Sequence, residues 1–148
     1  MIRQMASADA EQVAELEKSV FAVAWTLEDF KRAASDSNYL YFVDEEEGRI
    51  RGFCGALLSI DEGDITNIAV CPDCRCQHIG WNLMQTLLDE TDKRGIRKIF
   101  LEVRESNAAA RNLYQRNGFQ IAGRRKNYYR KPAEDALVMM RERKDVQP

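Results

Sequence analysis

The N-terminal part of the chain places apolar residues at helical spacing, after a short extended run at residues 2–5. Ser7 stands where an N-cap would open the first helix. Thr26 and Asp29 have the spacing of a capping box, which predicts a second helix ending near Ser35. The first helix rests on four apolar positions three or four residues apart: Ala10, Val13, Leu16 and Val20.

Extended patterns dominate the middle of the chain. Tyr39–Val43 is aromatic and apolar, and Ile50–Ile60 follows it after the acidic segment Asp44–Gly48. Two such runs around a turn predict a β-hairpin, and we expect the three glutamates at 45–47 to lie in its solvated turn. Asp64–Val70 predicts a further strand. The middle of the chain is therefore expected to contribute three strands.

The next helix is predicted from Ile79 to a cationic last turn, with Gly95 just past its end. Ile96–Val103 alternates apolar residues and predicts a buried strand. The helix rests on one apolar stripe: Ile79, Leu83, Met84, Leu87 and Leu88.

A short helix and two strands are expected in the C-terminal part. Ser106 or Asn107 would cap the helix, and the turn signal Asn117-Gly118 would end it. Phe119–Ala122 and Ala136–Met140 predict two final strands joined by a charged segment.

The predicted order of elements is β-αα-β-β-β-α-β-α-β-β. The strand–helix–strand unit at 64–103 implies a parallel strand pair, whereas the hairpins imply antiparallel pairs elsewhere. We therefore expect an α/β fold, with a mixed central sheet of about seven strands, helices on both faces and residues 1–148 forming one domain. A ligand site is expected where the strand at 64–70 leads into the helix at Ile79.

Composition excludes several classes of protein. The net charge of −2 over 148 residues gives no electrostatic basis for binding nucleic acid. No run of about 18 apolar residues is present, so we expect no membrane segment, and the N-terminus lacks the apolar core of a secretory signal. Four cysteines in such a chain indicate free thiols in a cytoplasmic protein.

Residues 71–80, CPDCRCQHIG, contain three of the four cysteines and the only histidine. Thiolate and imidazole are zinc ligands, so a zinc-binding interaction module is one interpretation. Four ligands within eight residues would have to wrap the metal tightly, and Pro72 restricts Cys71 to extended geometry. A nucleophilic pair of Cys76 and His78 lacks an orienting third group. We therefore expect no metal, and interpret the segment as a ligand-binding loop before a helix.

Three further segments carry a resemblance to a known family. ITNIAV at 65–70, LEVRESNAAARNLYQRNGF at 101–119 and RRKNYYRKPAEDALVM at 124–139 closely resemble the GNAT acetyltransferases. Within that family they are most similar to the bacterial ribosomal protein-alanine N-acetyltransferases. The resemblance covers essentially the whole chain and implies a GNAT fold.

The resemblance also implies roles for particular residues. Glu102 would be the general base and Tyr114 the general acid. The strand segment would offer backbone groups to the pantetheine arm and thioester of acetyl-CoA, and the loop and helix start would cradle its pyrophosphate. The implied cofactor-binding residues are Ile68, Ala69, Val70, Cys76, Gln77, His78, Ile79, Gly80, Trp81 and Asn107.

The loop departs from the family pattern R-G-x-G-x-G. Cys76 and His78 replace two of its glycines, and Trp81 stands where a cation is common. A Cβ at a position with positive φ costs about 1–2 kcal/mol, although histidine tolerates this region better than most residues. We expect weakened or ordinary binding of acetyl-CoA.

Each candidate also has a purely structural interpretation. Glu102 lies in a strand pattern with Phe100 and Arg104 on its own face, where a glutamate is ordinarily solvated or ion-paired. Tyr114 could be a core aromatic, and Asn107 could be only an N-cap. Tyr128 and its neighbour Tyr129 are expected to border the acceptor groove or to stack on each other.

The resemblance implies direct transfer of acetyl from acetyl-CoA to the N-terminal α-amine of a protein, an alanine of a ribosomal protein. An α-amine titrates near pH 8 and a lysine near about 10.4, so the α-amine needs less help from a base. Two alternatives remain: a GNAT enzyme acting on lysine or small amines, and a non-catalytic module that binds acyl-CoA or zinc.

Overall fold

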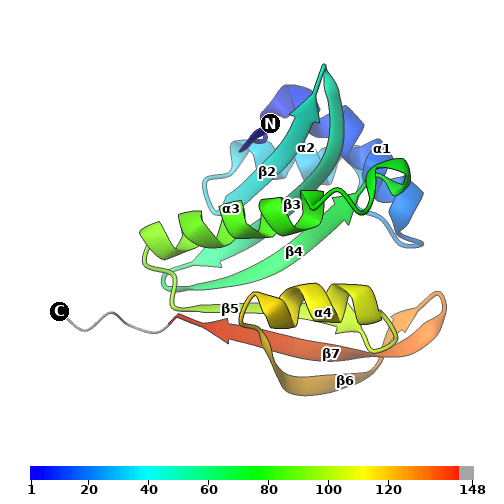
Figure 1. Ribbon diagram of the computed structural model, residues 1–148, viewed down its shortest axis with the longest axis vertical. Coiled ribbons are helices and arrows are strands. Elements are labelled where there is room, and N and C mark those ends of the chain that lie inside the picture. The colour runs from blue at the N-terminus through cyan, green and yellow to red at the C-terminus, as the bar shows by residue number, and fades with distance from the viewer. Residues whose placement is uncertain (144–148) are drawn as a thin grey trace.

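The computed structural model describes residues 1–143, in which seven strands form a mixed sheet (Figure 1). Only β4 and β5 pair in parallel, and the other neighbours are antiparallel. The sheet order is β1-β2-β3-β4-β5-β7-β6. The strands are β1 (Ile2–Gln4), β2 (Tyr39–Glu46), β3 (Arg49–Ser59), β4 (Glu62–Val70), β5 (Lys98–Arg104), β6 (Gln120–Arg130) and β7 (Ala133–Glu142).

Helices cover both faces of the sheet, as Figure 1 shows. Two of them pack against a core that includes Phe30 and Phe53, and the other two against cores that include Leu83 and Leu101. No helix in the described part of the chain is long and apolar enough to cross a membrane. The first pair is α1 (Ala10–Val20) and α2 (Leu27–Ser35), and the second is α3 (Ile79–Lys93) and α4 (Ala108–Arg116). The 3₁₀ turns are η1 (Ser7–Asp9) and η2 (Pro72–Cys74).

The predicted fold class and element order are confirmed. The capping box of α2 is also confirmed, since Thr26 Oγ1 accepts from the Asp29 amide at 3.2 Å and the Thr26 amide donates to Asp29 Oδ2 at 2.9 Å. The predicted cap at Ser7 is wrong. The chain enters α1 through η1, and the Asp9 carboxylate accepts from the Ala6 amide at 2.8 Å.

Two charged segments belong to strands rather than to connections. Glu45 and Glu46 continue β2, so the turn is confined to Glu47 and Gly48, whose φ angles are 52° and 81°. The charged segment expected between the last two strands forms most of β6. This strand is at the edge of the sheet and almost every residue is exposed, so it lacks the apolar alternation that identifies a strand.

Strands β4 and β5 stay paired over only part of their length. Glu62–Asp64 pairs with Lys98–Phe100, and from Ile65 onward no described residue pairs with β4 along this edge. Thr66 is an extra residue in β4, since Gly55 pairs with Asn67 while the next residue of β3 pairs with Ile65. Backbone N–H and C=O groups of β4 are therefore free at the centre of the sheet, next to the connection that leads to α3.

Candidate active site

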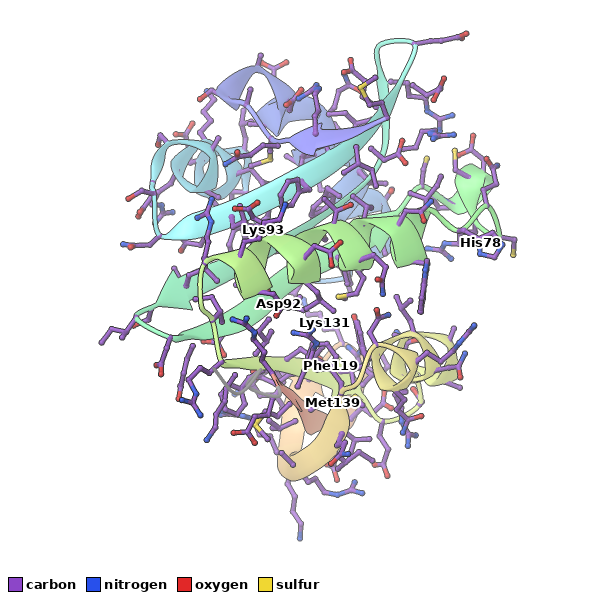
Figure 2. All side chains as sticks on the ribbon, turned by 60° about the vertical axis from the view of Figure 1, so that its left-hand side comes forward. His78, Asp92, Lys93, Phe119, Lys131 and Met139 are labelled. Atoms are coloured by element: carbon purple, nitrogen blue, oxygen red, sulfur yellow. The ribbon has the colours of Figure 1, made fainter. Side chains whose placement is uncertain are left out.

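The connection between β4 and α3 contains two left-handed residues. Cys76 has φ 67°, and His78 has φ 61° and ψ 18° as the N-cap of α3. These are the two residues that replace family glycines, so the loop does require positive φ at both. Both side chains are exposed, and Figure 2 shows His78 at the N-terminal end of α3, at the periphery of the molecule. The loop thus keeps a glycine-type conformation with two side chains that disfavour it.

The N-terminus of α3 has no side-chain cap, unlike the N-termini of α2 and α4. Within residues 1–143 the amides of Ile79, Gly80 and Trp81 donate no hydrogen bond. A Cβ built on Gly80 would be 3.7 Å from Val70 and 3.8 Å from Leu113, which places this first turn between β4 and α4. Free amides and the positive end of the helix dipole favour an anion there, so the residues present fit a phosphate group.

Trp81 brings a cation to this end of α3 although it carries none itself. The Arg116 guanidinium of α4 lies 5.3 Å from the centre of the Trp81 ring, within cation–π range. Trp81 was predicted to be an unusual residue at a position where cations are common. Arg116 was not predicted as a site residue, because no pattern within α4 signals a contact with α3.

Asn107 caps α4, as one of its two interpretations predicted. Its Oδ1 accepts from the Ala110 amide at 3.1 Å. The side-chain Nδ2 donates to no group in residues 1–143. The cap therefore leaves the amide nitrogen free for a cofactor contact, which stays a prediction.

Glu102 lies on the face of β5 that α4 does not cover. Its neighbours Leu101 and Val103 are buried on the α4 face, as the predicted alternation requires. The Glu102 carboxylate is 28% exposed and lies 3.7 Å from Arg125 Nε. A hydrogen bond to Glu102 is the main cause that raises the pKa of Tyr128. Glu102 is thus half-buried and lies among polar groups from β6.

Asp64, at the last paired position of β4, lies near the same carboxylate. Burial raises the pKa of Asp64, and the negative charge of Glu102 raises it further. Sequence reasoning missed Asp64 because only the register of β4 and β5 places it beside Glu102. Two carboxylates at the point where the strands separate make this face attractive to a cationic amine.

Tyr114 lies on the opposite face of β5, in the core that contains Leu101 and Val103. It is 6% exposed, and its ring centre is 5.9 Å from that of Phe119. Burial raises the pKa of Tyr114 above its usual value, so the hydroxyl keeps its proton at neutral pH. Among the described residues this hydroxyl has no hydrogen-bond partner, and it is not fully enclosed. It can therefore donate to a ligand.

Tyr128 and Tyr129 contact each other edge to face, with ring centres 5.1 Å apart and planes at 86°. Arg104 lies over the Tyr129 ring at 4.3 Å. The two rings are therefore in contact, but edge to face rather than stacked. Tyr128 is 47% exposed on the same face as Glu102, where it is available to an acceptor.

The cysteines do not gather as the zinc interpretation requires. Possible ligand atoms of Cys71, Asp73 and Cys74 lie within 4.8 Å of one another, but neither Cys76 nor His78 joins this group. Arg49 Nη2 is 2.8 Å from Cys71 Sγ and 2.8 Å from Asp73 Oδ1. A guanidinium therefore neutralises the atoms that would hold a metal cation. All four cysteines are free thiols.

Comparison with known proteins agrees with this geometry. Residues 10–119 match the family model described as the acetyltransferase (GNAT) family. A Bacillus subtilis (strain 168) protein, provisionally named ribosomal protein bS18-alanine N-acetyltransferase, is 38% identical over 139 residues, which cover 93% of this chain and 92% of the relative.

Solved structures show the same relationship. The ribosomal-protein-S18-alanine N-acetyltransferase from Escherichia coli superposes with a TM-score of 0.91 and 34% identity, over 99% of this chain and 96% of that chain. Arabidopsis thaliana NAA60 in complex with acetyl-CoA shares the fold, with a TM-score of 0.87 and 16% identity over 96% of this chain and 97% of that chain. The resemblance predicted from the motifs is confirmed, and the chain belongs to the GNAT family of acetyltransferases.

Proposed function

We propose that this chain transfers the acetyl group of acetyl-CoA to the α-amine of an N-terminal alanine, on a ribosomal protein such as bS18. The observation that carries the chemistry is the placement of Glu102 and Tyr114 on opposite faces of β5, beside the opening between β4 and β5. The choice of acceptor rests on the names of the Bacillus subtilis and Escherichia coli relatives, which this chain matches over most of its length.

Acetyl-CoA supplies a thioester whose carbonyl carbon bonds to the amine nitrogen and whose sulfur leaves as a thiolate. The free amides of Ile79, Gly80 and Trp81, with Arg116 nearby, would hold its pyrophosphate. In a strand, the N–H groups of successive residues point to opposite edges, so at least one residue of Ile68–Val70 presents a donor and an acceptor to the open edge. An N–H there would stabilise the developing negative charge on the carbonyl oxygen.

The two side chains divide the proton transfers between the faces of the sheet. Glu102, on the face away from α4, accepts a proton from the amine, directly or through one water molecule. Tyr114, on the α4 face, donates its proton to the departing sulfur. The acceptor would therefore enter from the α1 and α2 face and the cofactor from the α3 and α4 face. No covalent bond to the protein is required, so transfer is direct within a ternary complex.

An α-amine fits this site better than a lysine side chain. At pH 7 about a tenth of an α-amine is neutral but far less than a hundredth of a lysine, given their usual pKa values of about 8 and 10.4. The α-ammonium is the more acidic of the two, so the Glu102 carboxylate, 3.7 Å from Arg125, removes a proton from it more readily than from a lysine. The proposal takes residues 1–148 as one cytoplasmic acetyltransferase domain with no nucleic-acid, membrane or metal partner.

The test is acetyl transfer to a synthetic peptide that begins with alanine, with the product mass and the modified nitrogen recorded. The control peptides have the same sequence with a blocked α-amine and one lysine, and spermidine represents the small amines. We expect one acetyl group on the α-amine at neutral pH and no product from the blocked peptide. Acetylated lysine or spermidine as the main product would contradict the α-amine assignment.

A further inference from the structure

The buried carboxylate of Glu17 links two segments on the α1 and α2 face of the sheet, where the acceptor is proposed to bind. Glu17, near the C-terminus of α1, is 2% exposed. Its Oε2 accepts from the Trp25 amide at 2.9 Å, and both its oxygens accept from Asn67 Nδ2 at 3.2 and 3.1 Å. Trp25 belongs to the α1–α2 connection (residues 21–26), and Asn67 belongs to the bulge of β4. A single side chain therefore ties this connection to the strand that opens the site.

The network continues through Tyr41 to the extra residue of the bulge. The Tyr41 hydroxyl, from β2, donates to Asn67 Oδ1 and shares a hydrogen bond with Thr66 Oγ1. To reach β4 the ring crosses over Gly55 of β3, where a Cβ would lie 2.2 Å from the ring. The absence of a side chain at Gly55 therefore leaves room for the Tyr41 ring. The Tyr41 hydroxyl in turn holds the bulge where β4 separates from β5.

The α1–α2 connection lies on the acceptor side of the sheet. Trp25 packs against the rings of Phe30 and Tyr41 at 5.3 and 6.1 Å, on the face covered by α1 and α2. That is also the face on which Glu102 lies. Figure 1 shows the connection (blue) and the β6–β7 turn (orange) on the same side of the molecule as the C-terminal end of β4. Phe21 and Val23 of the connection are exposed apolar side chains.

We propose that Glu17 is a positioning residue, which fixes the α1–α2 connection against the β4 bulge and thereby sets how the acceptor peptide binds. The inference rests on the proposed function for its effect on the peptide. Within residues 1–143 no other side chain accepts from the Trp25 amide, so Glu17 alone supplies the hydrogen bond that holds the backbone of the connection at Trp25. Burial of a carboxylate is costly unless its oxygens are hydrogen-bonded, and both oxygens of Glu17 have partners here, one in the connection and one in β4.

The test compares Glu17→Ala, Glu17→Gln and Val13→Ala. Hydrogen–deuterium exchange at the Trp25 amide reports the connection directly, and kinetics with an alanine-initiated peptide report the acceptor side. For Glu17→Ala we expect exchange at Trp25 and the peptide KM to rise by about tenfold, the scale of one hydrogen bond to a charged acceptor. The Kd of acetyl-CoA should change less than twofold, because its binding face is opposite.

Glu17→Gln should restore the contact. Its side-chain oxygen can accept from the Trp25 amide, and its NH₂ can donate to Asn67 if that amide turns over. The Tyr41 hydroxyl would then accept from Asn67 and donate to Thr66, so every member of the network keeps a partner. We expect exchange at Trp25 and the peptide KM within about threefold of the unmodified protein.

Val13→Ala is the stability control, since Val13 is fully buried in the same helix. It should lower the melting temperature without changing the KM or exchange at Trp25. The inference fails if Glu17→Ala leaves both unchanged, if Val13→Ala raises the KM equally, or if Glu17→Gln is as damaging as Glu17→Ala. If the unmodified protein does not acetylate the peptide, the proposed function fails, while exchange at Trp25 still decides whether Glu17 holds the connection.

Discussion

Replacing His78 by glycine should stabilise the protein and tighten its binding of acetyl-CoA. His78 has φ 61° and its side chain caps nothing, so removing the imidazole breaks no hydrogen bond of the described structure. The left-handed conformation costs a residue with a Cβ about 1–2 kcal/mol. Glycine avoids this cost but gains freedom in the unfolded chain, which offsets about 0.5–1 kcal/mol. The free energy of unfolding should therefore rise by about 0.5–1 kcal/mol.

The same strain relief should favour the loop conformation that binds the cofactor. If strain keeps part of the free protein in other loop conformations, relief of about 1 kcal/mol tightens the Kd by up to about fivefold. Calorimetric titration with acetyl-CoA measures the Kd, and thermal unfolding without ligand should show a rise of about 1–4 °C.

Two control variants separate backbone strain from the imidazole itself. Gln77 has no positive φ, so Gln77→Gly should lose stability where His78→Gly gains it. His78→Ala keeps the Cβ and should leave the Kd within about twofold, because only the imidazole is removed. Weaker binding by both His78 variants would refute the reasoning and show that the imidazole contacts a phosphate. A loss of stability in His78→Gly equal to that in Gln77→Gly would refute the strain argument.

Three further predictions follow from the site. Glu102→Gln and Tyr114→Phe should each lower kcat by about a hundredfold or more with little change in the Kd of acetyl-CoA, and unchanged rates would remove both assigned roles. Arg116→Gln should weaken acetyl-CoA binding by about three- to tenfold and reduce its salt dependence, whereas Lys18→Gln, on an exposed part of α1, should do neither. Burial raises the pKa of Glu17 above its usual value of 4.5, and the negative charge of Asp29 in α2 raises it further. The protonated Glu17 side chain therefore stabilises the fold fully below pH 4.5, and this stabilisation is lost as the pH rises through the folded pKa. Glutamine does not titrate, so the melting temperature of Glu17→Gln relative to the unmodified protein should increase with pH. A difference that stays constant with pH would contradict this.

Local signals made much of the fold predictable. The capping box at Thr26 and Asp29, the glycine at 95 with φ 79°, and the alternation through β5 each specify structure within a few residues. Element order then followed from the sequence of such signals. β6 was largely missed because an edge strand exposed on both faces has no apolar period, and Ser7 was misassigned because it lies inside the 3₁₀ turn η1, where the Asp9 carboxylate accepts from the Ala6 amide.

The site was predictable only where a residue is identified by its own pattern. The alternation of β5 correctly put Glu102 opposite Leu101 and Val103. Its neighbours Asp64 and Arg125 come from strands that are brought together by register, which no local pattern encodes. The same holds for the contact of α4 with α3, and for the network around Glu17, whose members lie as far as 50 residues apart in the chain.

The unusual loop and the contact between α3 and α4 are best understood together. A glycine-rich loop presents backbone amides without strain, and a cation on the helix adds charge. Here Cys76 and His78 keep the same backbone conformation at a cost of about 1–2 kcal/mol each, and the charge comes from Arg116 across the Trp81 ring. The amides at the start of α3 remain uncapped. The proposed phosphate site therefore relies on backbone geometry and on a cation from a second helix. We therefore expect cofactor affinity to depend both on strain in the loop and on the position of α4, the helix that also carries Tyr114.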